Sequence, residues 1–325
     1  MYPFAFHRAG DEGEAIRAAA AGARPLAGGT TLVDLMREHI EQPKALVEIN
    51  QLPGRKIEIT ARGLEIGALA RMSDVAADPE VRASYPVIAQ SLLASASPQI
   101  RNMASIGGNL MQRTRCTYFR DPGVPCNKKQ PGSGCPARTG VHRSHGIFGV
   151  SDDCIATHAS DLAVALLALD TIVYVRGSAG ERSFPLAKLY LLPGKTPHLE
   201  HTLRPGELIV RVLVPAGAHT AHSHYLKVRD RASYEFALVS AAVALHTEGG
   251  VIRAARVGAG GVGTMPWRLR NVEKALVGQQ SREAAWRSAA ARAGEGAQPL
   301  TQNAFKVELL KRTVLRALEE VGGNI

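Results

Sequence analysis

The feature that most constrains this chain is a long irregular segment that holds all of its cysteines. Residues 111–154 are rich in glycine, proline and basic residues and have no sustained helical or strand periodicity. The four cysteines of the protein all lie there: Cys116, Cys126, Cys135 and Cys154. Inside a compact domain, a segment of this length needs a cross-link to become ordered. Two disulfides, a zinc ion or an iron–sulfur cluster would each supply one.

The spacing of the cysteines helps to distinguish these three cross-links. Nine, eight and eighteen residues separate successive cysteines, whereas structural zinc sites typically use pairs that are roughly two to four residues apart. Two disulfides require an oxidising compartment and are unusual in a chain with an ample core. Four well-separated thiolates can surround a 4Fe-4S cube. A 4Fe-4S cluster is therefore the preferred interpretation, and zinc or disulfides remain alternatives.

The same segment concentrates positive charge. Between residues 109 and 146 the single acidic residue is Asp121. Seven basic residues share that stretch: Arg113, Arg115, Arg120, Lys128, Lys129, Arg138 and Arg143. We expect them to offset the net negative charge of a cluster. Three histidines also lie close by: His142, His145 and His158. With four cysteines available, we expect these histidines to support the ligands or to lie at the surface.

Length and composition indicate a globular protein of more than one unit. At 325 residues the chain is long enough for two or three compact units, and its 45% apolar and 21% charged residues are near globular averages. The longest apolar run, residues 162–169, is too short to cross a membrane. The N-terminus shows no signal peptide. We therefore expect a cytoplasmic protein, or a periplasmic one if a signal-bearing partner exports it.

The net charge admits several kinds of partner. A formal charge of +10 suits nucleic acid, an anionic cofactor or an acidic protein. A basic zinc-binding module for nucleic acid is the alternative from another functional class. The basic run has only Tyr118 and Phe119 as interleaved aromatics, which is poor for stacking on bases. We expect no nucleic-acid binding.

Hydrophobic patterns elsewhere predict an α+β fold, because strands and helices are partly segregated along the chain. Helices are expected at about 11–21, 32–40, 73–95, from 161, and at 268–277, 282–294 and 303–321. Strands are expected at 24–27, 44–50, 56–60, 64–70, 171–177, 207–215, 223–230 and on both sides of the Gly249-Gly250 turn. A polar stretch near 216–222 indicates a domain boundary. We expect domains at 1–220, with parts 1–54 and 55–220, and at 221–325.

Two glycine turns have the character of anion-binding sites. "LAGGTTLVDLM" places Gly28 and Gly29 between a strand and a helix, where backbone N–H groups and the helix dipole favour a phosphate. "SIGGNL" repeats this pattern at 105–110, with Ser105 and Asn109 as polar neighbours. Each turn alone is a weak signal, but two of them are able to clasp one diphosphate. Neither has the Walker or the G-x-G-x-x-G spacing.

These motifs resemble those of a known family. In order and separation, "AGGTTL" and "SIGGN" are similar to the two FAD diphosphate motifs in the flavoprotein subunits of xanthine dehydrogenase, carbon monoxide dehydrogenase and aldehyde oxidoreductases. The resemblance continues through "SDLAVALLALD", "ELIVRVLVP" and "YLKVRDRASYEFALVSAAVAL". It implies a two-part FAD-binding domain of the vanillyl-alcohol-oxidase/carbon monoxide dehydrogenase flavoprotein type. A C-terminal α+β domain with a small antiparallel sheet and helices would follow.

The resemblance also implies a set of FAD-binding residues. Those at the diphosphate would be Leu26, Ala27, Gly28, Gly29, Thr30, Thr31, Leu32, Ser105, Gly107, Gly108 and Asn109. Asp161 would be a further FAD contact, and Ile209 and Lys227 would lie nearer the flavin ring. From position alone, Asp161 is equally well read as a helix N-cap and Lys227 as a solvated strand lysine. No catalytic residue is assigned.

The cysteine segment extends the resemblance. Typical family members join the "GGN" turn to the "SD" helix through a few residues, and this chain inserts about forty. The insertion resembles the cluster-binding insertion in the FAD subunit of periplasmic aldehyde oxidoreductases, and a related one occurs in 4-hydroxybenzoyl-CoA reductases. Cys116, Cys126, Cys135 and Cys154 would then ligate a 4Fe-4S cluster.

The function implied by the resemblance is electron transfer within a heterotrimer. A large subunit would carry the molybdenum cofactor, and a small subunit would carry 2Fe-2S clusters. This chain would pass electrons through the 4Fe-4S cluster to FAD and on to an external acceptor. A subunit of a 4-hydroxybenzoyl-CoA reductase-like enzyme is one alternative. An FAD oxidase of the vanillyl-alcohol type is another, but no separate substrate domain is evident.

Overall fold

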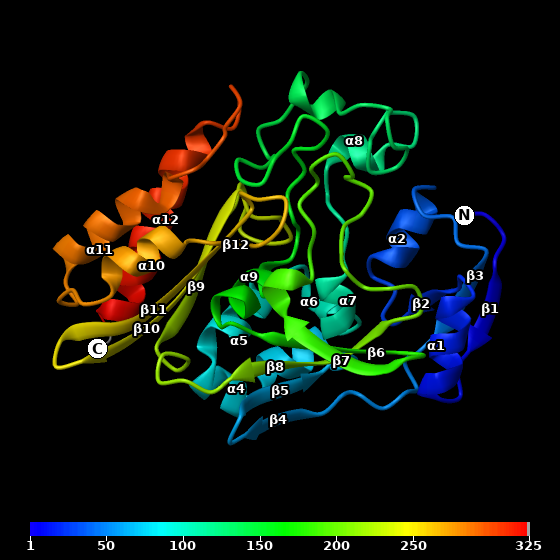
Figure 1. Cartoon of the computed structure of the whole chain (residues 1–325), viewed down its shortest axis with the longest axis horizontal. Coiled ribbons are helices and arrows are strands. Elements are labelled where there is room, and N and C mark those ends of the chain that lie inside the picture. Colours follow the sequence, from blue (N-terminus) through cyan, green and yellow to red (C-terminus); the bar gives the residue numbers. More distant parts are fainter. Residues whose placement is uncertain (324–325) are drawn as a thin grey trace.

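The computed structural model describes residues 1–323 and contains three β-sheets with helices beside each (Figure 1). The mixed architecture confirms the α+β prediction. In the view of Figure 1 the N-terminal sheet lies at the right, the second sheet lies at the centre and the C-terminal sheet lies at the left. The cysteine segment, which contains α8 (Thr117–Arg120), lies at the top of this view, above the second sheet.

The N-terminal sheet has three parallel strands in the order β1-β3-β2. Its strands are β1 (Ala5–Arg8), β2 (Arg24–Leu26) and β3 (Ala45–Glu48), and its helices are α1 (Glu12–Ala20) and α2 (Leu32–Arg37). The side chain of Asp11 caps α1 by accepting from the Glu14 N–H at 2.7 Å. The sequence analysis missed β1, because all four of its residues are exposed and show no alternation.

The second sheet has five antiparallel strands in the order β4-β5-β8-β6-β7. They are β4 (Ile57–Thr60), β5 (Gly63–Gly67), β6 (Ile172–Gly177), β7 (Gly180–Pro185) and β8 (Leu208–Pro215). The helices here are α3 (Met72–Ala77), α4 (Pro79–Ser84), α5 (Pro86–Leu93), α6 (Pro98–Arg101), α7 (Ile106–Leu110) and α9 (Asp161–Ala168). The single helical region expected at 73–95 is divided by Pro79 and Pro86, each of which begins a new helix.

The C-terminal sheet has four antiparallel strands in the order β12-β11-β10-β9. They are β9 (Ser223–Val228), β10 (Val239–Glu248), β11 (Val251–Gly260) and β12 (Trp267–Arg268), and helices α10 (Arg270–Leu276), α11 (Glu283–Ala290) and α12 (Phe305–Gly322) follow. Gly249 and Gly250 have φ of 57° and 76° at the tight turn between β10 and β11, a conformation that favours glycine.

Strand β10 has a hydrophobic core on each of its faces. Val243 and Leu245 pack in the core that β10 shares with α10, α11 and α12. Ala242 and Ala244, on the opposite face, belong to the core around α5 and α9. Small alanine side chains let α5 and α9 pack closely against the sheet. The C-terminal sheet is therefore a layer between two sets of helices.

The cysteine segment stays largely irregular, as predicted. Its regular elements are α8 (Thr117–Arg120) and a 3-10 helix at Pro136–Arg138. In residues 1–323 no helix is both long and apolar enough to span a bilayer.

Candidate functional site

The two glycine turns predicted from the sequence lie in contact. A Cβ atom placed on Gly28 would lie 1.9 Å from the backbone oxygen of Met103 and 3.1 Å from the Ala104 nitrogen. Met103 and Ala104 lead directly into Ser105, the N-cap of α7, whose hydroxyl accepts from the Gly108 N–H at 3.1 Å. Glycine at position 28 is therefore required for the close approach of the two turns.

The first turn is fixed by β3 and leaves polar groups available. The Asn50 side chain donates to the Ala27 carbonyl at 3.0 Å, which anchors the turn to the end of the N-terminal sheet. Thr31 is the N-cap of α2, but its hydroxyl makes no capping bond. Gly29 has φ of 72°, and residues 27–32 are all partly exposed. The turn thus presents hydroxyls and bare backbone to a ligand.

The second turn is connected to Asp161 through Ser160. The Ser160 hydroxyl donates to the Asn109 side-chain oxygen at 2.5 Å and also accepts from the Ala163 N–H at 2.9 Å. Ser160, rather than Asp161, is therefore the N-cap of α9. The interpretation of Asp161 as an N-cap is wrong, because its carboxylate faces away from the helix terminus toward β9.

Asp161 forms a buried ion pair with Lys227. Their side chains are 7% and 4% exposed, and the Lys227 Nζ lies 2.8 Å from a carboxylate oxygen of Asp161. Ser95 and Tyr225 also donate to this carboxylate, at 2.9 and 2.6 Å. Burial, and after it the negative charge of Asp161, raise the pKa of Tyr225 well above its usual value, so its hydroxyl stays a donor. Lys227 is therefore not a solvated strand lysine.

Ile209 lies apart from this ion pair. It is on β8 and packs against the core around α5 and α9. Its neighbour Val210 accepts from the Ala68 N–H at 3.0 Å, and the Ala68 carbonyl accepts from the Gly107 N–H at 2.8 Å. The backbone thus connects β8 to the second glycine turn by a short path, while none of the hydrogen bonds found in residues 1–323 links Ile209 directly to Asp161.

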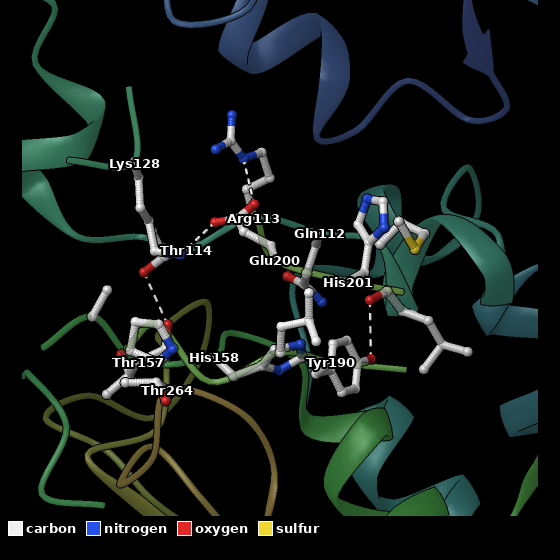
Figure 2. A pocket seen from close by; sticks show the side chains of 15 residues that line it. Gln112, Arg113, Thr114, Lys128, Thr157, His158, Tyr190, Glu200, His201 and Thr264 are labelled. Atoms are coloured by element: carbon white, nitrogen blue, oxygen red, sulfur yellow. Dashed lines mark hydrogen bonds and ion pairs between the residues drawn. The ribbon is translucent and has the colours of Figure 1, made fainter. Parts of the chain in front are cut away.

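Two pockets lie beside these residues, and His158 lines both. One contains Ser160, Asp161, Phe236 and Gly261. The second lies between the cysteine segment and the 190–201 loop (Figure 2), and its polar lining residues include Arg113, Lys128, Tyr190, Glu200 and His201.

His158 presents an unused polar atom in these pockets. Its Nδ1 accepts from the Ser160 N–H at 3.2 Å, while its Nε2 is buried and has no hydrogen-bond partner within the described chain. Burial lowers the pKa of His158 to about 4, so the ring is neutral and Nε2 carries the proton. A buried N–H without a protein acceptor is rare and suits a ligand acceptor.

The sequence analysis missed Tyr190 and Glu200 as pocket residues. Although burial opposes it, Lys128 and Arg113 hold the pKa of Glu200 below its usual value. Burial raises the pKa of Tyr190, whose hydroxyl donates to the Leu110 carbonyl at 3.0 Å. Both residues lie in a polar loop without periodicity, so no sequence signal marked them.

The four cysteines are brought together at one place as free thiols. Burial raises the pKa of Cys116 to about 12 and that of Cys154 to about 11. Charge on Cys126 adds to both shifts, and Cys135 adds to that of Cys154, so the four sulfurs are electrostatic neighbours. In residues 1–323, however, no three His, Cys, Asp or Glu side chains are close enough to hold a single metal ion.

Backbone N–H groups point at these sulfurs. The Cys154 sulfur accepts from the Ala156 N–H at 3.5 Å. The Cys116 sulfur receives bonds from the backbone of Tyr118 and Phe119, which offset part of the effect of burial on its pKa. Backbone donors at Cys116 and Cys154 would stabilise negative charge on these two sulfurs.

His145 is the histidine that contacts a cysteine. Its Nε2 lies 3.2 Å from the Cys116 sulfur, and its ring is buried. His142 is also buried, but its ring bonds to Gly140 and to Gln302 instead. Of the three histidines, His145 is therefore the one whose ring contacts a cysteine sulfur within the described residues.

Most of the basic side chains of the segment form ion pairs. Arg115 and Arg120 pair with Asp34 on α2, and Arg143 makes two bonds to Asp230, at 2.8 and 3.0 Å. Six of the seven pair with a carboxylate: Arg113, Arg115, Arg120, Lys128, Arg138 and Arg143. Among them, Lys128 also lowers the pKa of Cys154, against the larger effect of burial. The positive charge therefore mainly attaches the segment to the rest of the molecule.

The buried ion pair leads to a stability prediction. Lys227→Met should lower the free energy of unfolding by about 3 kcal/mol, because it leaves a buried carboxylate without its counter-charge. Urea denaturation measures this value. Lys195→Met, which breaks the pair of the 85% exposed Lys195 with Asp153, is the matched control and should change stability by less than about 1 kcal/mol. An equal decrease of the free energy of unfolding in the two variants would contradict the prediction.

Comparisons with known proteins agree with this arrangement. Residues 2–217 match the family described as the FAD binding domain in molybdopterin dehydrogenase, and residues 224–321 match the CO dehydrogenase flavoprotein C-terminal domain. The aldehyde oxidoreductase FAD-binding subunit PaoB of Escherichia coli (strain K12) is 47% identical over 98% of both chains. The carbon monoxide dehydrogenase medium chain of Hydrogenophaga pseudoflava is 25% identical over 97% of this chain and 96% of its own.

A solved structure has the same fold. The reconstituted CO dehydrogenase from Oligotropha carboxidovorans superimposes with a TM-score of 0.78 at 22% identity, covering 100% of each chain. The matched domains span nearly all of the chain, in the order that the glycine turns and the following strands predict. The chain therefore belongs to the FAD-binding medium subunits of the molybdenum hydroxylase family, a family of oxidoreductases.

Proposed function

We propose that this chain is the electron-transfer FAD subunit of a heterotrimeric, molybdenum-containing aldehyde oxidoreductase. A large molybdenum-cofactor subunit and a small 2Fe-2S subunit are its proposed partners. Electrons pass from the 2Fe-2S centres through a 4Fe-4S cluster on this chain to FAD and on to an external acceptor. The observation that carries the proposal is the convergence of four free cysteines in a segment that packs on α2, the helix that follows the first of two touching glycine turns.

The residues around the glycine turns fit an FAD. The close approach at Gly28, the unused hydroxyl of Thr31 and the cap at Ser105 suit a diphosphate held between two turns. The unpaired Nε2–H of His158 offers a buried donor next to Asp161. The proposed FAD-binding residues are Leu26, Ala27, Gly28, Gly29, Thr30, Thr31, Leu32, Ser105, Gly107, Gly108, Asn109, Asp161, Ile209 and Lys227.

The cysteines fit a cluster better than a single ion. Around one zinc ion, sulfurs at ~2.3 Å from the metal would lie only ~3.8 Å apart. A cube binds each thiolate at a different iron, so the sulfurs stand further apart. The wide spacing of the four cysteines along the chain, with nine, eight and eighteen residues between them, also favours a cluster over a zinc site. Binding to iron would also remove the protons that burial retains on Cys116 and Cys154.

The residues of this chain hold and orient the groups that carry electrons. When bound, a 4Fe-4S cluster supplies one-electron transfer, and FAD supplies storage of one or two electrons. Four cysteines fix the position of the first group, and the glycine turns fix that of the second. Aldehyde as the substrate class rests on the full-length similarity to an aldehyde oxidoreductase subunit. A 4-hydroxybenzoyl-CoA reductase-like complex is the second candidate, favoured by the cysteine insertion alone.

The domain limits and the compartment belong to this proposal. FAD binding is assigned to residues 1–220, in parts 1–54 and 55–220 with 111–154 as the iron–sulfur insertion, and residues 221–325 form the C-terminal domain. The compartment follows the partners, and is periplasmic where a signal-bearing partner is exported with this chain and cytoplasmic otherwise.

Replacing Gly28 tests the FAD assignment. Gly28→Ala should weaken FAD binding by at least about tenfold, because the new methyl group would push the two glycine turns apart. Flavin retained after gel filtration, measured by absorbance, gives the occupancy. Gly10→Ala, where the new methyl group meets a side-chain oxygen at 3.4 Å, is the control and should keep its flavin. Full occupancy in Gly28→Ala would reject the assignment.

Iron analysis tests the cluster. Anaerobically purified protein should contain about four irons per chain, the number in a four-cysteine cube. Cys135→Ser should lose most of the iron and make residues 111–154 sensitive to proteolysis, since metal binding supplies folding energy to this segment. FAD should largely remain, because the glycine turns belong to the scaffold. Zinc without iron, in protein produced with adequate cluster assembly, would refute the electron-transfer path.

Assays of the chain without its partners test which subunit oxidises the substrate. The isolated chain should not oxidise aldehydes, because it carries no substrate-oxidising group, yet its reduced flavin should pass electrons to a dye. Steady-state assays with the isolated chain and with the complex measure both activities. Aldehyde turnover by the isolated chain would be incompatible with the proposed function.

A further inference from the structure

The start of helix α12 carries a buried cation that has no carboxylate partner. The Lys306 side chain is 0% exposed. Its Nζ donates to the carbonyl oxygens of Ser144 at 2.8 Å and Gly261 at 2.7 Å, and within residues 1–323 it has no ion pair. Burial, and after it the charge of Arg143, lower the pKa of Lys306 to about 7, because a buried ammonium is costly unless a negative charge lies near it.

Lys306 lies beside the part of the cysteine segment that touches Cys116. Ser144 immediately precedes His145, whose Nε2 is 3.2 Å from the Cys116 sulfur. The Asn303 side chain donates to the carbonyl oxygens of His145 at 3.3 Å and of Gly146 at 3.1 Å. Side chains of Asn303 and Lys306 thus fix the backbone on both sides of His145, while the buried Nδ1 of its ring has no hydrogen-bond partner within residues 1–323.

The other cations of the segment are already engaged. Arg113, Arg120 and Arg143, for example, pair with carboxylates outside the segment. Lys306, on another domain, acts electrostatically on the His145 ring and is the buried cation beside it that forms no ion pair among the described residues. The arrangement accounts for both a buried lysine without a partner and a buried histidine directed at a sulfur.

We propose that the His145 N–H donates to the Cys116 sulfur and, together with the buried Lys306 ammonium, raises the reduction potential of the cluster. This inference rests on the proposed function. Adding one electron, supplied by a partner iron–sulfur centre, makes the site one unit more negative and transfers no proton. A hydrogen-bond donor and a nearby cation stabilise the more negative form. His145 and Lys306 are therefore positioning residues that tune the cluster rather than ligands.

A redox titration of the complex, followed by EPR, tests this proposal. His145→Phe keeps a ring and removes the donor. The midpoint reduction potential of the cluster should therefore become more negative by up to about 59 mV, which corresponds to a tenfold change in the one-electron equilibrium constant. Lys306→Met should shift it in the same direction. His142→Phe is the matched control, because the buried His142 ring bonds to Gly140 and Gln302 rather than to a sulfur. Its midpoint should match that of the unaltered protein.

The possible outcomes separate this inference from the proposed function. Unaltered protein without iron would refute the proposed function itself. Iron-bearing His145→Phe with an unchanged midpoint, or with a shift equal to that of His142→Phe, would overturn the inference and leave the cluster in place. If His145→Phe retains no iron, pulsed EPR on unaltered protein labelled with 15N-histidine decides. Absence of both an exchangeable proton and a 15N coupling to the reduced cluster would overturn it.

Discussion

The buried ion pair between Asp161 and Lys227 is the interaction on which the rest of the arrangement depends. Asp161 begins α9, and Lys227 lies on β9 of the C-terminal sheet, so their 2.8 Å contact joins the two main parts of the molecule. Ser95 and Tyr225 complete the hydrogen bonding of the carboxylate. Because both charges are almost excluded from water, neither is stable without the other. Ser160, next to Asp161, connects the ion pair to the second glycine turn, because its hydroxyl donates to the side-chain oxygen of Asn109.

The cysteine segment is held by ion pairs and, near its end, by Ile147 and Phe148, which pack into the core of the C-terminal sheet and its helices. Phe119 and Cys126 form only a small buried cluster with Leu35 of α2. Arg120, 10% exposed, pairs with Asp34 and Glu38 on the same helix, where partial burial makes an ion pair stronger than at the surface. A segment attached in this way keeps its position, and its interior can contain the four cysteines. That division explains why a long irregular insertion is compatible with an otherwise regular flavoprotein fold.

Local patterns predicted most of the fold and part of the site. The glycine turns and the cysteines were identified from residue type alone, because only glycine lacks a side chain and only cysteine has a thiol. Asp161 and Lys227 were found only through the family resemblance, since position alone suggested a cap and a surface lysine. Glu200 carried no signal, because its partners Arg113 and Lys128 lie far away in the sequence. Ion pairs between distant segments depend on tertiary packing, which periodicity does not encode.

Lys306 connects the two parts of the candidate site. One of its hydrogen bonds reaches Ser144, next to the histidine at Cys116, and the other reaches Gly261, which lines the same pocket as Asp161. A single buried side chain thus bridges the cysteine segment and the wall of the proposed flavin pocket. Buried polar groups of this kind resist displacement, because each lost bond leaves a carbonyl unsatisfied. The C-terminal domain is therefore bonded to both parts of the candidate site through Lys306, although the glycine turns and the cysteines themselves all lie in the N-terminal part of the chain.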